Sequence, residues 1–405
     1  MVYASPQGLQ MFGERWDRIV AERGAQAALY LADGRATTFR ELDAEARALK
    51  PAGDHVLVQG DVPQILRQLL AGFLREVPVQ LVEKDRARRV PASPVPPGTA
   101  LIKQAVGGSG VRRCQFFTFD QIAADVDRLH EALDLGARGA GVAAISCAHS
   151  FGLTMTVLQT LFNGVPTCFA PQPFAQPLME AMKHHQRLFL PGVPALWKAW
   201  LMGDVRFDNI SLAISAGSPL TSGLERMALE QHGLKINNLY GTSECGAVCW
   251  DETPDLREDG RALGTLLPGV QAQTDAEGRL IVTSSSVGLG YDEQLPQEQY
   301  GDGVFTTSDQ IEQQGNRLWF QQCAGAGINV AGRKLSPAEI AEKIMRASQL
   351  EHVKIYGTRS RDPERCQDIV AEFDLPQAEI NAAFKITACS LLAPWEVPRK
   401  WIGRS

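Results

Sequence analysis

The stretch from residue 118 to residue 169 limits the possible folds most strongly, because it predicts a helix, a strand, a helix and a strand in succession. Apolar residues recur at helical spacing between Thr118 and Leu133. Val142 to Ile145 is typical of a buried strand, Leu153 to Phe162 of an apolar helix, and Val165 to Phe169 of a second strand. A helix that joins neighbouring strands makes them parallel, so we predict an α/β fold with helices on the faces of parallel-rich sheets.

Further short strands extend this pattern towards the middle of the chain. They are predicted at Arg187 to Leu190, Leu212 to Ser215 and Lys235 to Leu239, and each is followed by a turn that contains glycine. Ligands of parallel sheets bind at the carboxyl ends of the strands. These turns are therefore the first place to look for a site.

The elements predicted after Asp309 are typical of a smaller α+β unit. Its strands are expected at Arg317 to Gln321, Ile328 to Val330, Val353 to Tyr356 and Asp368 to Phe373, and its helices at Pro337 to Met345 and Ala378 to Phe384. A chain of 405 residues is long enough for more than one core. We predict a large N-terminal domain over residues 1–324 and a small C-terminal lid domain over residues 325–405.

Composition excludes several classes of partner. The net charge is −6 and the basic residues are scattered, which argues against a nucleic-acid partner. No apolar stretch approaches the roughly 20 residues that span a bilayer. The start of the chain lacks the pattern of a signal peptide, so we expect a cytoplasmic protein with reduced cysteines and no membrane partner. The histidines and cysteines do not cluster as metal ligands.

A glycine-rich loop, Val106 to Arg113, is the first candidate for chemistry. Its glycines would let backbone N–H groups approach a phosphate, and Arg112 or Arg113 could add positive charge. The loop matches neither the P-loop nor the dinucleotide fingerprint. A plain flexible turn is an equally open interpretation.

The second candidate, Asn238 to Glu244, lies at the end of a predicted strand. Tyr240 offers an aromatic face for a purine, Thr242 a hydroxyl for a phosphate, and Glu244 a hard oxygen ligand for Mg²⁺. These groups suit a metal-nucleotide site. The alternative is a polar turn that contains a buried tyrosine.

The run Tyr240 to Glu244 resembles the Tyr-Gly-x-Thr/Ser-Glu signature of the adenylate-forming ligase superfamily, which includes acyl-CoA synthetases, peptide-synthetase adenylation domains and luciferases. Other segments resemble family segments in the expected order: Leu190 to Pro194, Ser215 to Leu220, Gly264 to Val270, Gly288 to Tyr291, Thr307 to Asp309 and Ile328 to Pro337. The resemblance runs from about residue 35 to the end. The version of the Ile328 to Gly332 segment resembles that of compact aryl-acid ligases of secondary metabolism.

The resemblance implies ATP-dependent activation of a carboxylic acid as acyl-AMP, with transfer to the thiol of CoA or of a carrier protein's phosphopantetheine. An aromatic acid is the preferred substrate. The implied catalytic residues are Glu244, which would also hold Mg²⁺, Thr242 and His149. The implied ATP and AMP contacts are Gly107, Gly108, Ser109, Gly110, Arg113, Ser215, Ala216, Gly217, Ser218, Tyr240, Gly241, Thr242 and Asp309.

Departures from the family pattern leave a second hypothesis open. Ser109 alone remains of the hydroxyls of the phosphate loop, Ser308 replaces a glycine, and Cys323 stands where relatives carry a ribose-binding arginine. The stretch before the glycine loop is short, and the chain stops before the loop that carries the adenylation lysine in relatives. We therefore expect adenylation to be the weaker half-reaction. The alternative is a non-catalytic relative that binds an acyl group, an adenylate or a protein partner.

Overall fold

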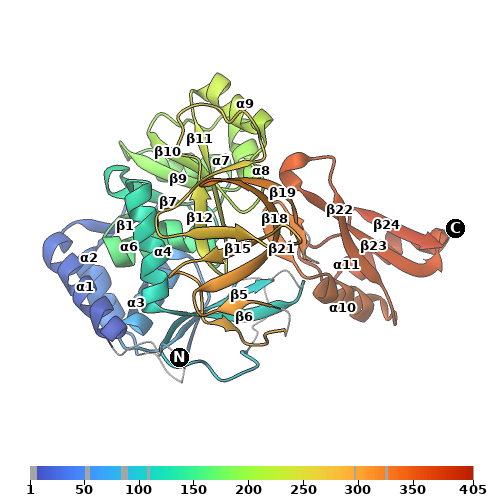
Figure 1. Cartoon of the computed structure of the whole chain (residues 1–405), viewed down its shortest axis with the longest axis horizontal. Helices are drawn as coiled ribbons and strands as arrows, with labels where there is room; N and C mark the ends of the chain where they lie inside the picture. The colour runs from blue at the N-terminus through green and yellow to red at the C-terminus, as the bar shows by residue number, and fades with distance from the viewer. Residues whose placement is uncertain are drawn as a thin grey trace.

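One long sheet runs through the larger part of the molecule (Figure 1). The computed structural model describes residues 7–50, 55–83, 90–106, 110–295, 298–323 and 327–404. Within these residues the sheet has 14 strands in the order β14-β15-β18-β19-β13-β12-β11-β10-β9-β7-β8-β1-β2, with β17 paired to β18. The strands are β1 (Ala27–Tyr30), β2 (Ala36–Thr38), β7 (Ala140–Ala143), β8 (Thr167–Phe169), β9 (Leu188–Gly192), β10 (Ile210–Ser215), β11 (Ile236–Thr242), β12 (Gly246–Trp250), β13 (Ala262–Leu266), β14 (Gln271–Thr274), β15 (Arg279–Thr283), β17 (Tyr300–Gly301), β18 (Val304–Gln314) and β19 (Arg317–Cys323).

The central strands of this sheet are parallel, as the sequence predicts. Pairing is parallel from β11 through β10, β9, β7 and β8 to β1, and antiparallel on both sides of that block. A second sheet has five strands in the order β16-β6-β5-β4-β3. These are β3 (Val56–Val58), β4 (Val79–Leu81), β5 (Thr99–Val106), β6 (Arg112–Thr118) and β16 (Gly290–Tyr291).

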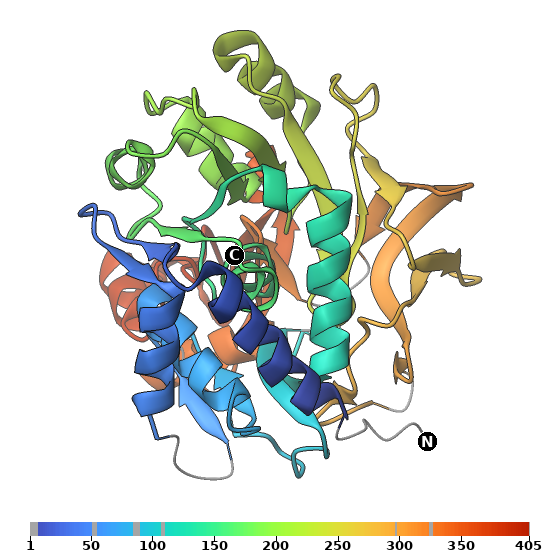
Figure 2. The same ribbon diagram turned by 90° about the vertical axis from the view of Figure 1, so that its left-hand side faces the viewer.

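Helices cover both sheets and bury three apolar cores. They are α1 (Gln7–Arg23), α2 (Phe39–Ala48), α3 (Val62–Phe73), α4 (Phe119–Ala132), α5 (Ser150–Gly152), α6 (Leu158–Asn163), α7 (Ala175–Met182), α8 (Pro194–Leu201) and α9 (Ser222–His232), with a π-helical turn at Leu153–Val157 between α5 and α6. Helices α1 to α3 pack on the five-stranded sheet and face the viewer in Figure 2. The predicted helix at Thr118 is α4, and the Thr118 side chain caps it by accepting from Gln121 N–H.

Helix α4 joins two of these cores. Ile122 and Val126 belong to the core shared with α1, α3 and the five-stranded sheet, whereas Leu129 and Leu133 belong to the core beneath β10 to β13. Because its apolar residues face two layers, the helix is buried on more than one side. A third core lies between the parallel strands and helices α7 to α9.

The residues from Ile328 onwards form sheets and a core of their own (Figure 1). The hairpin β20 (Ile328–Val330) and β21 (Arg333–Leu335) precedes a three-stranded sheet of β22 (Lys354–Arg359), β23 (Gln367–Pro376) and β24 (Lys400–Arg404), with helices α10 (Pro337–Ser348) and α11 (Ala382–Cys389). The structure therefore has a large α/β part and a small α+β part. The boundary expected at 324/325 lies outside the described residues and stays a prediction.

Two expectations about this unit were wrong. The strand at Arg317 to Gln321 belongs to the large sheet, because β19 forms a hairpin with β18 and also pairs with β13. The helix expected from Ala378 begins at Ala382 instead, since the Asn381 side chain accepts from Phe384 N–H and caps the helix there.

Among the described residues, no helix has the length and apolar character needed to cross a bilayer.

Candidate active site

A cavity of about 220 Å³ opens at the carboxyl ends of the parallel strands. Its walls include residues that follow β7, β9, β10 and β11, together with parts of β5, α4 and the hairpin β20–β21. The ligand position expected for a parallel sheet is therefore the observed one. Of the candidate residues, six line the cavity: His149, Ala216, Gly217, Gly241, Thr242 and Glu244.

Glu244 lies in the tight turn between β11 and β12. Its carboxylate is 6% exposed, and Tyr291 Oη donates to its Oε1 at 2.6 Å. Burial, and then the charge of Glu244, raise the pKa of Tyr291 well above its usual value, so the phenol stays a donor. The turn also needs Gly246 at φ +73°, because a Cβ there would lie 2.3 Å from Asp125 Oδ1. The carboxylate is thus held in a fixed position at the cavity wall.

Tyr240 and Asp309 form a second polar pair next to the cavity. Tyr240 Oη donates to Asp309 Oδ2 at 2.8 Å, and the two residues come from β11 and β18. Burial and the neighbouring Asp309 charge raise the pKa of Tyr240 well above its usual value. The structure brings together two groups that the sequence places 69 residues apart.

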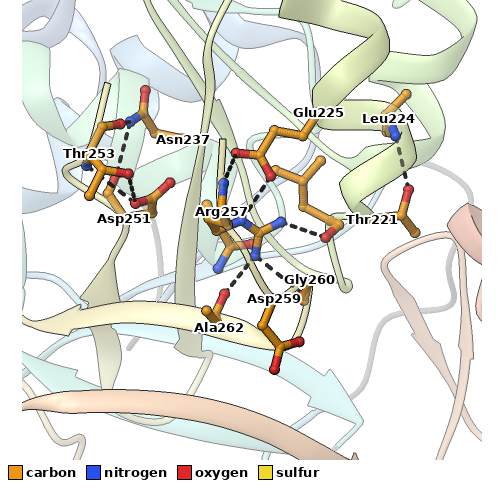
Figure 3. A network of polar contacts seen from close by, with 12 residues as sticks. Thr221, Leu224, Glu225, Asn237, Asp251, Thr253, Arg257, Asp259, Gly260 and Ala262 are labelled. Atoms are coloured by element: carbon orange, nitrogen blue, oxygen red, sulfur yellow. Dashed lines mark hydrogen bonds and ion pairs between the residues drawn. The ribbon is translucent and has the colours of Figure 1, made fainter. Parts of the chain in front are cut away.

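The loop after β10 carries Ser215 to Ser218 and is supported by a buried ionic network (Figure 3). Arg257 Nε donates to Glu225 Oε2 at 3.0 Å, and its Nη2 donates to Leu220 O at 2.6 Å. Glu225 is completely buried and also pairs with Lys235. Because one arginine joins the helix α9 carboxylate to the loop carbonyl, the network fixes the end of the loop.

Two features of this loop fit a bound nucleotide. The Ser215 hydroxyl is buried and has no hydrogen-bond partner within the described part of the chain. Gly217 has φ +83° and is exposed at the cavity, where its carbonyl accepts from Asn329 Nδ2. An unsatisfied hydroxyl beside an exposed glycine is what an absent polar ligand would leave behind.

His149 lies at the open end of the cavity, with 43% of its side chain exposed. Its Nε2 is 2.7 Å from Glu83 Oε1, and the same oxygen accepts from Arg333 Nη1 at 2.5 Å. Arg333 belongs to the hairpin β20–β21, whereas Glu83 and His149 belong to the large part. The contact therefore joins the small part to the rim of the cavity.

Arg113 does not lie along the cavity as expected for a phosphate ligand. It is 2% exposed, its Nη2 donates to Glu298 Oε1 at 2.6 Å, and its guanidinium lies 3.6 Å from the centre of the Tyr291 ring. Its neighbour Arg112 instead pairs with Glu339 of α10. Burial lowers the pKa of Arg113, but its Glu298 partner outweighs this and raises it, so the charge is retained for that ion pair. Arg113 thus acts on the residue that holds Glu244.

Among the remaining candidate residues of the glycine loop, the structure describes only Gly110. Gly107, Gly108 and Ser109 lie outside the described residues. Gly110 adopts φ +74°, which favours glycine, and it is not part of the cavity wall. Among the described residues, Ser218 is also not part of that wall.

Magnesium fits this site only together with a ligand. Among the described residues, no group of three or more His, Cys, Asp or Glu side chains could hold a metal ion. Mg²⁺ in nucleotide enzymes uses one or two carboxylates plus phosphate oxygens and water. One carboxylate of the cavity wall, that of Glu244, fits that pattern.

The sequence interpretation missed Lys103, Asp125 and Glu83. Lys103 and Asp125 line the cavity although both are more than 90% buried. The sequence held a signal for each of the first two. Lys103 follows the apolar Leu101-Ile102, and Asp125 occupies an apolar position of α4. Glu83 follows β4 without any local pattern to mark it.

Comparisons with known proteins agree on the family. Residues 112–291 match the model of the AMP-binding enzyme family. The chain is 23% identical over 232 residues to 4-hydroxybutyrate–CoA ligase 1 of Metallosphaera sedula, a match that covers 51% of this chain and 40% of the relative. It is 22% identical over 266 residues to 3,4-dihydroxybenzoate–[aryl-carrier protein] ligase of Bacillus anthracis, which covers 64% of this chain and 58% of the relative. The chain therefore spans about half the length of these relatives.

Solved structures share the fold over almost the whole chain. A double mutant of o-succinylbenzoate CoA synthetase from Bacillus subtilis, bound with a product analogue, gives a TM-score of 0.80 at 15% identity and covers 96% of this chain and 94% of its own. The same synthetase with its acyl-adenylate intermediate gives 0.66 at 14% identity, with 96% and 94% covered. The chain is thus similar in sequence to AMP-binding enzymes over residues 112–291 and shares the fold of these CoA synthetase structures.

Proposed function

We propose that this protein activates a carboxylic acid as acyl-AMP with ATP and then transfers the acyl group to a thiol. One observation carries the proposal: Thr242 and Glu244 line a single cavity, and Tyr240, on the same strand as Thr242, donates to Asp309 of β18. These groups match the needs of a nucleotide that carries a metal and a phosphate. The relatives whose names describe CoA or carrier-protein ligases support it.

Each group has a separate task in this proposal. The Tyr240 ring and the loop Ser215 to Ser218 hold adenine, Asp309 accepts from the ribose hydroxyls, and Thr242 donates to the α-phosphate. A carboxylate is a poor electrophile, and its conversion to a mixed anhydride creates a good leaving group. Mg²⁺, held by Glu244, would neutralise charge on the departing pyrophosphate.

The open end of the cavity suits a thiol that arrives on a long arm. Gly332 and Lys334 of the hairpin line it opposite His149. The acceptor is CoA or the phosphopantetheine of a carrier protein, and the higher TM-score against the product-analogue complex favours this arrangement for the thioester step. The predicted aromatic acid remains part of the proposal, as do a role in secondary metabolism and a cytoplasmic location, where ATP and CoA are found.

A pyrophosphate-release screen over aryl and aliphatic acids tests the proposal. We expect release with at least one acid, dependent on Mg²⁺, and formation of a thioester when CoA or a carrier protein is added. Thr242→Ala should reduce release with any active acid. Arg226→Met, on the outer face of α9, is the control that should leave release unchanged.

A second candidate is a non-catalytic relative that binds an acyl-adenylate. The observation that favours it is Arg113, which stands at the usual lysine position of the phosphate loop but is bound to Glu298. Calorimetry with AMP and a non-hydrolysable acyl-adenylate separates the two functions. Tight binding of the analogue without pyrophosphate release by any acid would favour the second candidate and contradict the first.

A further inference from the structure

The cavity has an open end and a buried end. At the open end lie His149, Gly217 and Gly241, and at the buried end lie Lys103 and Asp125, with exposures of 8% and 7%. Nucleotide contacts are proposed at Gly217, Gly241 and Thr242. An acid whose carboxylate meets the nucleotide there can reach Lys103 and Asp125 with its far end, since both line the same cavity.

Lys103 is an unusual residue for this position. It lies on β5, its ammonium is 4.2 Å from the centre of the Phe117 ring, and it has no hydrogen-bond acceptor or ion-pair partner within the described part of the chain. Burial lowers its pKa, whereas Asp125 and Glu244 act in the opposite direction. Gln115, its direct cross-strand neighbour, is also fully buried, and both of its amide atoms lack partners. Lys103 lines the cavity, so its ammonium is available to a ligand group there.

Asp125 supplies the complementary group. Its Oδ1 accepts from Ala247 N–H at 2.8 Å, which orients the carboxylate at the cavity wall. Arg128, one turn further along α4, acts on Asp125 through its charge alone, because its guanidinium donates to Ser284 Oγ, Ser286 Oγ and a backbone carbonyl. Lys103 and Asp125 both line this cavity and attract each other electrostatically, so its buried end presents a donor and an acceptor.

We propose that Lys103 and Asp125 select an acid that carries a hydroxyl group at the end remote from the activated carboxylate. A hydroxyl accepts from Lys103 and donates to Asp125, so it satisfies both groups. A second carboxylate would satisfy Lys103 but would be repelled by Asp125 and Glu244 at low dielectric. An ammonium group would be repelled by Lys103, and an apolar end would leave the lysine without a partner.

This inference rests on the proposed function but is tested by binding as well as turnover. The probes are three sets of acids: 4-hydroxybenzoate with benzoate, 4-hydroxybutyrate with butyrate, and terephthalate as the second-carboxylate analogue. Calorimetry on the whole chain with AMP present measures the dissociation constant of each. Since the hydroxyl meets one charged donor and one charged acceptor, we expect it to tighten binding by about 10- to 100-fold in at least one pair.

Variants of the two residues test the assignment. Lys103→Met and Asp125→Asn should each bring the ratio within the pair to about threefold or less, chiefly by weakening the hydroxylated acid. Lys183→Met, an exposed helix-end lysine, is the matched control and should leave the ratio unchanged. Thermal melting of each variant with AMP establishes that it is folded.

Several results would overturn the inference: no measurable binding of any acid, equal binding within both pairs, tighter binding of terephthalate, or variants that weaken both members of a pair equally. Failure of the proposed function gives a different result from failure of this inference. A hydroxyl preference in binding without pyrophosphate release refutes the function and leaves the selection in place, whereas equal turnover of both members refutes the selection and leaves the function.

Discussion

Arg333→Met should weaken the thioester step selectively, because Arg333 joins the small part to the large part in the observed arrangement. Its Nη1 lies 2.5 Å from Glu83 Oε1, with 25% and 12% of the two side chains exposed. A charged hydrogen bond contributes about 1.5–3 kcal/mol, and partial exposure favours the lower value. The stacking of Arg333 on Trp395, at 4.1 Å, stays within the small part and does not depend on where that part lies. Methionine retains this packing and removes the charge.

The expected shift is therefore about 1.5 kcal/mol, or roughly tenfold in the population of the observed arrangement. The small part would not be released, since Lys198 still pairs with Asp362 and Glu364, and Asn329 Nδ2 still donates to Gly217 O. Thioester formation from a supplied acyl-adenylate should fall by up to about tenfold.

Single-turnover assays of both half-reactions on one preparation provide the measurement. Adenylation should change by less than about twofold, because the Arg333–Glu83 contact belongs to the observed arrangement of the two parts, which we propose for the thioester step. Arg346→Met on α10, an exposed arginine of the same part, is the matched control. Equal losses in both half-reactions, or no loss in either, would refute the reasoning.

Other substitutions test the remaining contacts. Asp309→Ala should weaken AMP binding by about 10- to 100-fold in calorimetry through the loss of the ribose acceptor, and Tyr240→Ala should also weaken it; unchanged affinities would mean that the site is misplaced. Glu244→Gln should slow adenylate formation by about 10- to 100-fold and alter AMP binding little, because the metal serves the triphosphate; equal losses would contradict that role. Arg257→Met should lower the free energy of unfolding by about 3–5 kcal/mol in denaturant titrations, since it leaves the buried Glu225 carboxylate short of a partner. Arg261→Met, which removes an exposed ion pair, should lower it by less than about 1 kcal/mol. Similar losses in the two variants would argue against the ionic network.

Local patterns predicted the elements and the turns of this protein well. The helical spacing after Thr118 gave α4, and the apolar run at Leu212 to Ser215 gave β10, because burial on a packed layer requires those repeats. The turn Tyr240 to Glu244 was found because its chemistry is concentrated in five consecutive residues. The pairing of β19 with β18 was not found, since a short strand carries no local mark of the sheet that it joins.

Long-range electrostatics explains why Arg113 was misplaced. Its sequence position beside the glycine loop favours a phosphate ligand, but its ion-pair partner Glu298 is 185 residues away. A sequence pattern reports neighbours along the chain, and the partner of a buried charge is chosen by folding. The same reasoning applies to Glu83 and Arg333, which are separated by 250 residues.

The residues proposed to hold the nucleotide and those proposed to select the acid differ in where the fold puts them. Thr242 and Gly217 occupy turns at strand ends, where backbone geometry fixes their positions and a short motif can describe them. Lys103 and Asp125 lie within a strand and a helix, where the core determines only that the residue must be buried. Either could be replaced by an apolar residue of similar size without altering the sheet or helix that carries it, provided that the other loses its charge as well. Substrate choice in this fold can therefore change while the turns, and with them the nucleotide chemistry, stay the same.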